Sequence, residues 1–327
     1  MRAMRLEKVG QPLVMRELPD PQPGPRQILI RVEACAVCRT DLHVIDGELP
    51  PLLHAVTPGH EIVGIVEAVG DDVSIHGLGA RVGVGWLGST CQACPYCRHD
   101  RENLCDRPEF MGYSRDGGFA THVVAEADYA YLLPASPTPP ELAPLLCAGL
   151  IGWRSLAFAG DRGPLGLYGF GAAAHIVLQV ARWQNRRVFA FTRRSDTAAQ
   201  QLALQLGAEW VGVSGDTPPV QLEAAIIYAP VGELVPLALK QVRRGGSVVC
   251  AGIHMSDIPG FPYRDLWGER QIRSVANLTR QDAHDFLGLV PHIPLKTHTR
   301  TYPLQDANKA IEDLRAGRIQ GAAVLLP

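Results

Sequence analysis

Four cysteines lie close together in the segment CQACPYCRHDRENLC, at positions 91, 94, 97 and 105. Thiolates at such short spacings on one loop can surround a zinc ion as a tetrahedron, with Zn–S distances of about 2.3 Å. Four unrelated thiols are the alternative, but so dense a run is improbable by chance. Because four thiolates leave no open coordination position, Cys91, Cys94, Cys97 and Cys105 predict a structural zinc site.

A second set of residues that could bind a metal is spread along the chain. Cys38 lies in the segment CAVCRTDLH, His60 and Glu61 lie in TPGHE, and Cys147 lies in PLLCAGL. Taken singly, each has an ordinary explanation. A lone cysteine is usually a small buried residue, and a histidine before a strand can simply be hydrogen-bonded. Residue type alone therefore leaves these four positions open.

A glycine-rich turn begins the second half of the chain. The segment Gly169-Phe-Gly171-Ala-Ala-Ala174 follows the apolar run LGLY and opens a helical stretch. The two glycines allow a tight turn and a close approach of a pyrophosphate to the helix N-terminus, whose free N–H groups favour anions. Alanine is tolerated at the third fingerprint position. This strand–turn–helix context predicts a dinucleotide-binding site.

Taken in order, these motifs resemble one family over essentially the whole chain. The C-x-T-D-x-x-H and GHE segments, the four-cysteine cluster, the later lone cysteine and the glycine fingerprint resemble zinc-dependent alcohol dehydrogenases of the medium-chain dehydrogenase/reductase superfamily. The resemblance implies that Cys38, His60 and Cys147 bind a catalytic zinc ion, which is the established ligand set of alcohol dehydrogenases. It also implies that Glu61 lies beside the metal and that Asp41 accepts the ring N–H of His60.

The implied activity is reversible hydride transfer between NAD(P)+ and a small alcohol, or an aldehyde in the reverse direction. A zinc ion with an open position lowers the pKa of a bound hydroxyl group. The resemblance implies that Thr40 and His43 relay the proton, whereas the alternative is a helix cap and an exposed histidine. Trp86 either lines the substrate pocket or belongs to the core. Two other functions stay open: a zinc-free quinone oxidoreductase, or a non-catalytic structural relative.

The end of the second strand after the fingerprint predicts the choice of cofactor. NAD-binding folds usually carry an acidic residue there, which bonds the ribose 2′-hydroxyl. This chain has Thr192, Arg193 and Arg194 instead, so no carboxylate repels a 2′-phosphate and two guanidinium groups can pair with one. We therefore expect NADP to be preferred, with NAD possible if the arginines are only solvated surface residues.

The elements that must position these motifs change in character along the chain. A β-rich first part is followed, after the Pro-rich stretch 134–140 that we expect to be a linker, by alternating strands and helices. The resemblance implies an α/β protein with a GroES-like, partly open β-barrel catalytic domain at 1–149, a Rossmann domain with a doubly wound parallel sheet at 150–276, and a return to the catalytic domain at 277–327. The expected strands are 28–33, 61–69, 80–84, 120–124, 165–168, 188–192, 210–213, 225–228, 247–251 and 322–326, and the expected helices are 172–183, 196–206 (with Ser195 as N-cap), 233–240 and 305–316.

Composition excludes several other classes of protein. The 327 residues carry 31 basic and 33 acidic side chains, a balance that argues against binding nucleic acid through its phosphates. No apolar run reaches the roughly 18–20 residues of a membrane span, and charges interrupt the N-terminus, so we expect no membrane contact, no export signal and a cytoplasmic location. The 8 cysteines are then metal ligands or buried thiols. The family resemblance implies a homodimer or homotetramer.

Overall fold

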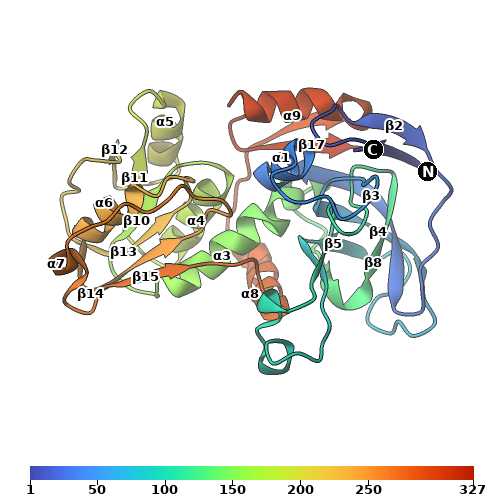
Figure 1. Cartoon of the computed structure of the whole chain (residues 1–327), viewed down its shortest axis with the longest axis horizontal. Helices are drawn as coiled ribbons and strands as arrows, with labels where there is room; N and C mark the ends of the chain where they lie inside the picture. The colour runs from blue at the N-terminus through green and yellow to red at the C-terminus, as the bar shows by residue number, and fades with distance from the viewer. The chain divides into compact units, whose positions relative to one another are not determined.

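The computed structural model describes all 327 residues, which divide into two compact units (Figure 1). Unit 1 comprises Met1–Cys147, Asn277–Pro291 and Thr297–Pro327, and unit 2 comprises Ala148–Ala276 and His292–Lys296. The Pro-rich stretch expected to be a linker lies inside unit 1, where Thr138 begins the short helix α2 (Pro139–Leu142). A proline at the first position of a helix is favourable because its missing N–H would be unpaired there anyway.

The main sheet of unit 1 has seven strands in the order β16-β17-β3-β4-β5-β9, with β8 paired to β3 beside this path. Every neighbouring pair is antiparallel except β16 and β17. Two further pairs, β1 with β2 and β6 with β7, form small separate sheets. The strands of unit 1 are β1 (Arg2–Arg5), β2 (Val14–Glu17), β3 (Gln27–Val37), β4 (Glu61–Val69), β5 (Arg81–Val84), β6 (Leu87–Ser89), β7 (Glu109–Phe110), β8 (His122–Glu126), β9 (Ala130–Leu132), β16 (Thr299–Pro303) and β17 (Ala322–Leu326).

Strand β3 is the central element of unit 1, because it pairs with β4, β8 and β17. Its side chains alternate between buried and less buried positions up to Val32, as expected of a strand with one covered face. From Ala34 to Val37 every residue is buried. The end of β3, which leads into the predicted ligand Cys38, is therefore enclosed on both faces.

Helices and short turns complete unit 1. Helix α9 carries Ala307, Ala310 and Ile311 into the same core as β3, as expected of a helix with one apolar face. The helices of unit 1 are α1 (Arg39–Asp46), α2, α8 (Arg280–Leu289) and α9 (Ala307–Arg315). The 3-10 turns within it are Cys97–His99, Glu102–Leu104, Ala127–Tyr129, Ala143–Leu146 and Leu304–Asp306.

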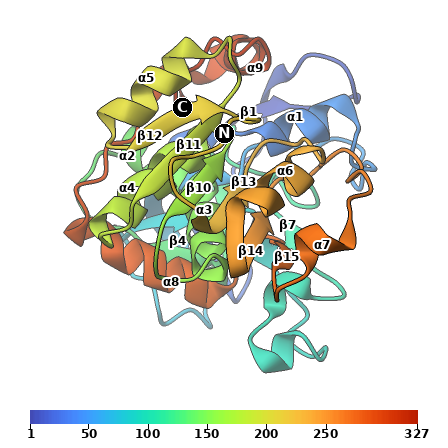
Figure 2. The same ribbon diagram turned by 90° about the vertical axis from the view of Figure 1, so that its left-hand side faces the viewer.

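Unit 2 contains a six-stranded sheet whose strands are all parallel, in the order β12-β11-β10-β13-β14-β15 (Figure 2). Numbered from the first strand, this is the 3-2-1-4-5-6 order of a Rossmann fold, so the predicted doubly wound sheet is confirmed. Its strands are β10 (Leu165–Tyr168), β11 (Val188–Thr192), β12 (Trp210–Val213), β13 (Leu222–Ile227), β14 (Val242–Cys250) and β15 (Gln271–Ser274). Its helices are α3 (Ala148–Phe158), α4 (Ala172–Trp183), α5 (Thr197–Gln205), α6 (Leu234–Gln241) and α7 (Tyr263–Leu266).

Both faces of this parallel sheet are buried, which explains why its central strands are continuous apolar runs. Tyr168, Phe191 and Ile227 pack on one face against the buried side of α6, while the alternate residues of β10 and β11 are also fully buried. One detail of the sequence prediction is wrong. The N-cap of α5 is Asp196, not Ser195, because the Asp196 carboxylate accepts a hydrogen bond from the N–H of Ala199 at 3.1 Å.

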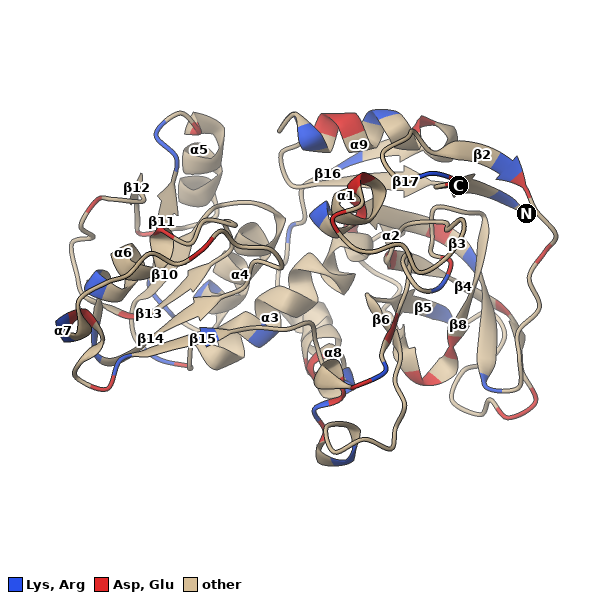
Figure 3. Cartoon of the chain, in the orientation of Figure 1, with Lys and Arg blue, Asp and Glu red and all other residues tan.

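No single helix of the protein is long and apolar enough to span a membrane. By length and composition alone, the consecutive pair Pro139–Leu146 and Ala148–Phe158 meets that criterion as a bent pair. Charged side chains are distributed over both units, with the loop that enters α5 among the basic segments (Figure 3).

Candidate active site

Helix α1 begins with a hydrogen-bonded cap that fixes two predicted site residues. Cys38 is the N-cap residue, with an extended backbone, and its N–H donates to Asp41 Oδ2 at 2.8 Å. In return, the N–H of Thr40 donates to Cys38 Sγ at 3.3 Å. This is a reciprocal capping box with a thiol in the place of the usual hydroxyl. The local sequence that starts the helix therefore also holds the Cys38 sulfur and the Asp41 carboxylate in place.

The Asp41 carboxylate extends from this cap to the predicted ligand His60. Its Oδ1 accepts hydrogen bonds from the N–H of Gly59 at 3.1 Å and from His60 Nδ1 at 3.2 Å. Because a carboxylate can only accept, Nδ1 carries a proton, which leaves Nε2 as the ring nitrogen that could bind a metal. His60 Nε2 is buried and has no hydrogen-bond partner. A buried histidine nitrogen in this state is suited to bind a metal.

Strand register brings Cys38 and His60 together. In the antiparallel pair β3 and β4, Ala36 lies opposite Glu61, so the residue after β3 and the residue before β4 leave the sheet at the same end. Cys147 comes from a distant part of the chain, between the 3-10 turn Ala143–Leu146 and α3. Its Sγ lies 3.8 Å from Cys38 Sγ.

The four side chains are spaced as zinc ligands would be. Ligand atoms of Cys38, His60, Glu61 and Cys147 all lie within 4.8 Å of one another. Two sulfurs bound to one tetrahedral zinc at about 2.3 Å each lie about 3.8 Å apart, which matches the observed sulfur separation. The unpartnered nitrogen of His60, the two sulfurs and the buried carboxylate therefore fit a zinc ion. We call these four residues the first cluster.

Several buried side chains that can ionise lie close together in the first cluster, and they shift one another's pKa values. The hydrogen bond between the thiols lowers the pKa of Cys38 and raises that of Cys147. Burial, together with the Cys38 thiolate, raises the pKa of Glu61 well above its usual range. Burial opposes a charged His60, but Asp41 and the Cys38 thiolate outweigh it and raise the pKa of the imidazole. Buried negative charge on this scale requires a balancing cation, either protons or a metal ion.

Cys91, Cys94, Cys97 and Cys105 form the second cluster, within the loop that joins β6 to β7. Cys91 Sγ lies 4.0 Å from Cys97 Sγ and 3.5 Å from Cys105 Sγ, and Cys94 Sγ lies 3.5 Å from Cys97 Sγ. Hydrogen bonds from the N–H groups of Ala93 and Cys94 lower the pKa of Cys91 to about 6. Backbone donors and short sulfur separations are what a four-thiolate zinc site requires.

The loop that carries the second cluster is attached to helix α8. The Glu102 carboxylate is buried, and its Oε1 accepts hydrogen bonds from the N–H of Arg280 at 2.8 Å and from its Nε at 3.3 Å. A carboxylate at the first residue of a helix satisfies a free N–H and favours the positive end of the helix dipole. The second cluster is therefore tied to an element 178 residues further along the chain.

A stack of aromatic rings lies next to the first cluster, with Trp86 as the ring that contacts it. The edge of Trp86 faces His60, with ring centroids 5.0 Å apart and planes at 77°. The Trp86 ring lies nearly parallel to Phe110 at 5.0 Å and to Tyr113 at 6.0 Å. Trp86 is thus both part of the core and next to the first cluster. Sequence patterns gave no signal for Phe110 and Tyr113, because their contacts depend on the β6–β7 pairing.

The two residues of the expected proton relay lie three positions apart on α1, which places them on neighbouring turns of one helix face. Thr40 is buried, and its N–H contacts Cys38. His43 is half-buried, and its Nδ1 forms a hydrogen bond with the Glu48 carboxylate. Glu48 lies just beyond the helix, and no motif in the sequence had pointed to it.

The glycine fingerprint has the expected strand–turn–helix form in unit 2. Gly169 directly follows β10 with φ of +84°, and a Cβ there would lie 2.9 Å from the N atom of Ala229. Gly171 is the N-cap of α4 and has open space around it, whereas Ala174 is fully buried. A bare backbone at the start of a helix is the form of a pyrophosphate site.

The end of β11 places Thr192, Arg193 and Arg194 in sequence beside this turn. Thr192 is buried, and its Oγ1 accepts a hydrogen bond from Gln200 Nε2 at 3.1 Å. The Arg193 side chain is 85% exposed and lies 3.9 Å from Asp196. Gln200, on α5, is a contact that the sequence prediction did not include. The basic loop visible before α5 in Figure 3 contains both arginines.

Comparison with known proteins decides the family. Residues 24–135 match the alcohol dehydrogenase GroES-like domain. Over 314 residues, 94% of this chain and 90% of its relative, the sequence is 48% identical to "Probable alcohol dehydrogenase AdhA" of Mycobacterium tuberculosis. The chain belongs to the alcohol dehydrogenases of the medium-chain dehydrogenase/reductase superfamily. An alcohol dehydrogenase of Geobacillus stearothermophilus is 34% identical over 99% of both chains.

Solved structures agree with this family assignment. A thermostable alcohol dehydrogenase from Pyrobaculum aerophilum, with bound cobalt and zinc, has a TM-score of 0.90 and 25% identity over 100% of this chain and 99% of its own. A "putative zinc-binding dehydrogenase" from Sinorhizobium meliloti 1021, bound to NADP, has a TM-score of 0.89 and 27% identity over 100% and 99%. The predicted GroES-like and Rossmann fold class is confirmed. This alcohol dehydrogenase interconverts an alcohol and its carbonyl compound with NAD(P).

Proposed function

We propose that this alcohol dehydrogenase is zinc-dependent and that its first cluster is the catalytic metal site. Cys38, His60 and Cys147 are the ligands, and Glu61 is a further carboxylate within reach. The observation that carries the proposal is the buried, unpartnered Nε2 of His60, held toward two sulfurs that are 3.8 Å apart. The Pyrobaculum aerophilum enzyme, which was solved with cobalt and zinc bound, supports a metal-dependent enzyme.

A zinc ion at this site would act as a Lewis acid that makes the hydroxyl group of an alcohol more acidic. The protein's own groups support that chemistry in separate ways. Asp41 holds the tautomer and the orientation of His60. Thr40 and His43 pass the alcohol proton toward solvent. Trp86 presents an apolar ring next to the first cluster, which keeps water away from it.

We further propose that the second cluster holds a structural zinc ion, so that each chain binds two. All four ligands are thiolates, and no side chain capable of acid–base catalysis forms part of the set. A zinc ion in the second cluster would cross-link the loop between β6 and β7, which also carries Glu102. Its role is therefore to fix the loop and not to take part in the reaction.

The preferred cofactor is NADP, bound by the Rossmann domain at residues 150–276, while residues 1–149 and 277–327 form the catalytic domain. The strand end at Thr192 lacks a carboxylate, and two arginines follow it. The relative from Sinorhizobium meliloti was solved with NADP, which supports this choice. The ratio of kcat/KM for NADP over NAD should exceed one in the wild type and fall on Arg193→Ala and Arg194→Ala. A wild type that favours NAD would contradict the proposal.

Elemental analysis together with turnover tests the zinc assignment. We expect two zinc ions per wild-type chain and oxidation of short-chain alcohols, followed by the change in nicotinamide absorbance. Cys38→Ser should fold, keep one zinc ion in the second cluster and lose turnover. Full activity in Cys38→Ser would refute the mechanism. A zinc-free quinone oxidoreductase would hold no metal at the first cluster and would reduce quinones instead.

We also propose that the protein forms a homodimer or homotetramer. Between 253 and 277, unit 2 exposes two large aromatic side chains, Tyr263 at 73% and Trp267 at 57%. Exposed rings of this size are typical of association surfaces. Light scattering at micromolar concentration should give the mass of two or four chains, and a monomer would contradict the proposal.

A further inference from the structure

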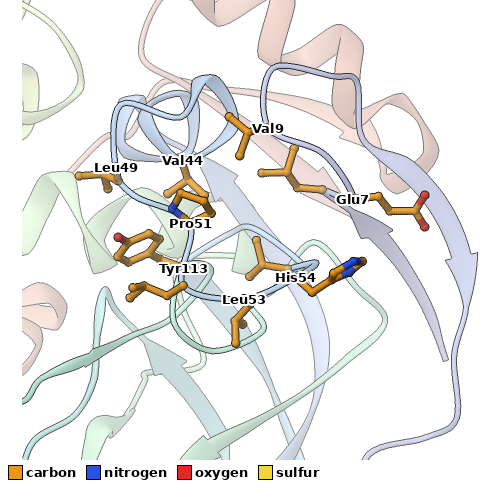
Figure 4. A pocket seen from close by; sticks show the side chains of 11 residues that line it. Glu7, Val9, Val44, Leu49, Pro51, Leu53, His54 and Tyr113 are labelled. Atoms are coloured by element: carbon orange, nitrogen blue, oxygen red, sulfur yellow. The ribbon is translucent and has the colours of Figure 1, made fainter.

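A cavity of about 410 Å³ lies in unit 1 beside the end of α1 and the loop that follows it (Figure 4). Apolar side chains make up the larger part of its lining: Leu6 and Val9 near the N-terminus, Val44 on α1, and Leu53 on the loop that follows α1. The polar side chains of Glu7 and His54 and the ring of Tyr113 complete it. Tyr113 and Leu49 lie at one side of it, and Glu7 and His54 lie at the opposite side. Its volume is within the range of small-molecule sites, about 300–1,000 Å³. We call it the loop cavity.

Tyr113 separates the loop cavity from the first cluster. Its ring lines the cavity, and it also lies nearly parallel to Trp86, with planes at 14° and centroids 6.0 Å apart. Trp86 in turn has its edge against His60. Of these rings, Tyr113 is therefore the one that stands at the cavity, with Trp86 between it and His60 on one side only of the ring stack.

The hydroxyl group of Tyr113 fixes this position. Its Oη donates a hydrogen bond of 2.6 Å to the carbonyl oxygen of Pro50, in the exposed loop that also carries Leu53. The phenol thus has two distinct roles. Its ring fills the space next to Trp86, and its hydroxyl ties the ring to the outer wall of the cavity.

We propose that Tyr113 is a specificity-determining residue, which limits the chain length of the alcohol by closing the loop cavity to the substrate. This inference rests on the proposed site at His60. Alcohols with a short or compact carbon skeleton fit in front of the Trp86–Tyr113 wall. A long aliphatic chain needs the apolar space behind it, where Val44 and Leu53 would contact its methylene groups.

Removal of the ring tests the proposal. In Tyr113→Ala, the ratio of kcat/KM for 1-octanol over ethanol should rise at least about tenfold relative to wild type, mainly through KM. Tenfold corresponds to about 1.4 kcal/mol, the burial of about two methylene groups. Tyr113→Phe is the matched control, because it keeps the ring and loses only the bond to Pro50. Its ratio should stay within about twofold of wild type.

A second substitution shows whether the loop cavity is the space that is used. Leu53→Glu places a charge on the cavity lining, so in the Tyr113→Ala background it should return the octanol-to-ethanol ratio to that of wild type. Binding gives a readout that does not depend on turnover: 1-octanol should raise the Tm of Tyr113→Ala more than that of wild type. If Tyr113→Ala does not fold, Tyr113→Leu replaces it, and its octanol-to-ethanol ratio of kcat/KM should rise about threefold over wild type.

The outcomes separate this inference from the proposed function. A wild type that oxidises neither alcohol, or that does so without zinc, contradicts the proposed function. An active wild type with an unchanged octanol-to-ethanol ratio in Tyr113→Ala overturns the role of Tyr113. A raised ratio that survives Leu53→Glu overturns the role of the loop cavity.

Discussion

Replacement of Asp41 by asparagine should weaken both the fold and the first cluster. The Asp41 side chain is completely buried and accepts three hydrogen bonds, two at Oδ1 from Gly59 and His60 and one at Oδ2 from Cys38. Asparagine has the same shape but only one accepting atom. Its carbonyl oxygen would serve the two donors of Gly59 and His60, and its NH2 group would then face the N–H of Cys38, donor against donor.

The size of the effect follows from these three bonds. A hydrogen bond to a charged acceptor contributes about 1.5–3 kcal/mol, and a neutral one roughly half as much. Asp41→Asn loses one charged bond and converts two to neutral ones, while the removal of a buried charge offsets part of the loss. We therefore expect the free energy of unfolding to fall by about 2–3 kcal/mol. Loss of the carboxylate behind His60 should also lower the zinc affinity of the first cluster by about 10–100-fold.

Urea unfolding and competition with a zinc chelator measure the two effects. Asp46→Asn is the matched control, because Asp46 lies on the same helix and its carboxylate makes a partly exposed ion pair with Arg315 at 2.8 Å. Such pairs contribute about 0–1 kcal/mol. The reasoning is refuted if Asp41→Asn is within 1 kcal/mol of Asp46→Asn and releases its more labile zinc no faster.

Three other substitutions probe separate features. Cys105→Ser should reduce the zinc content from two ions to one per chain and lower the Tm, as elemental analysis and calorimetry would show. Gly64→Ala places a Cβ 2.3 Å from a backbone carbonyl oxygen of β3, so it should cost about 2–3 kcal/mol in urea unfolding, whereas Gly77→Ala, with open space, should be nearly neutral. Hydrogen bonding from Tyr302 holds the pKa of Asp313 below its usual value, so this carboxylate stabilises the protein above about pH 4 and loses that effect as pH falls further. The difference in the free energy of unfolding between wild type and Asp313→Asn should therefore become smaller below pH 4. A difference that does not change with pH would contradict this prediction.

Helices and strands whose ends are marked by turn-forming residues were predictable from the sequence. The bounds expected for 61–69, 165–168 and 172–183 are those of β4, β10 and α4. The largely apolar runs of β10 and β4 are each followed by a glycine, β10 is also preceded by Pro164, and the fingerprint glycines mark the start of α4. Short strands without periodicity, such as β6, β7, β15 and β16, were not predicted. These strands form because they pair with another strand that is distant in the sequence. The residues of the strand itself do not indicate which strand that is.

The same distinction applies to the candidate site. The second cluster lies within 15 consecutive positions, so its spacing alone predicted it. Cys38 and Cys147 are 109 positions apart, and only the ordered set of family motifs connected them in advance. What the sequence could not supply is the register that sets Ala36 opposite Glu61, since a shift of one residue would turn every side chain to the other face. The contacts of Tyr113 and Phe110 with Trp86 likewise depend on strand pairing, in this case of β6 with β7.

Strands β6 and β7 pair with each other, Leu87 opposite Phe110 and Ser89 opposite Glu109. The cysteine-rich segment between them therefore leaves and rejoins the rest of unit 1 at adjacent points. All four cysteines of the second cluster lie within this segment, which is also held to α8 through Glu102 and Arg280. Trp86 precedes β6 directly, and Phe110 is the last residue of β7. A variant in which a tight turn joins β6 to β7 would lack the second cluster but keep the residues of the first cluster. Its Tm and its kcat would show whether the second cluster contributes to stability, to turnover or to both.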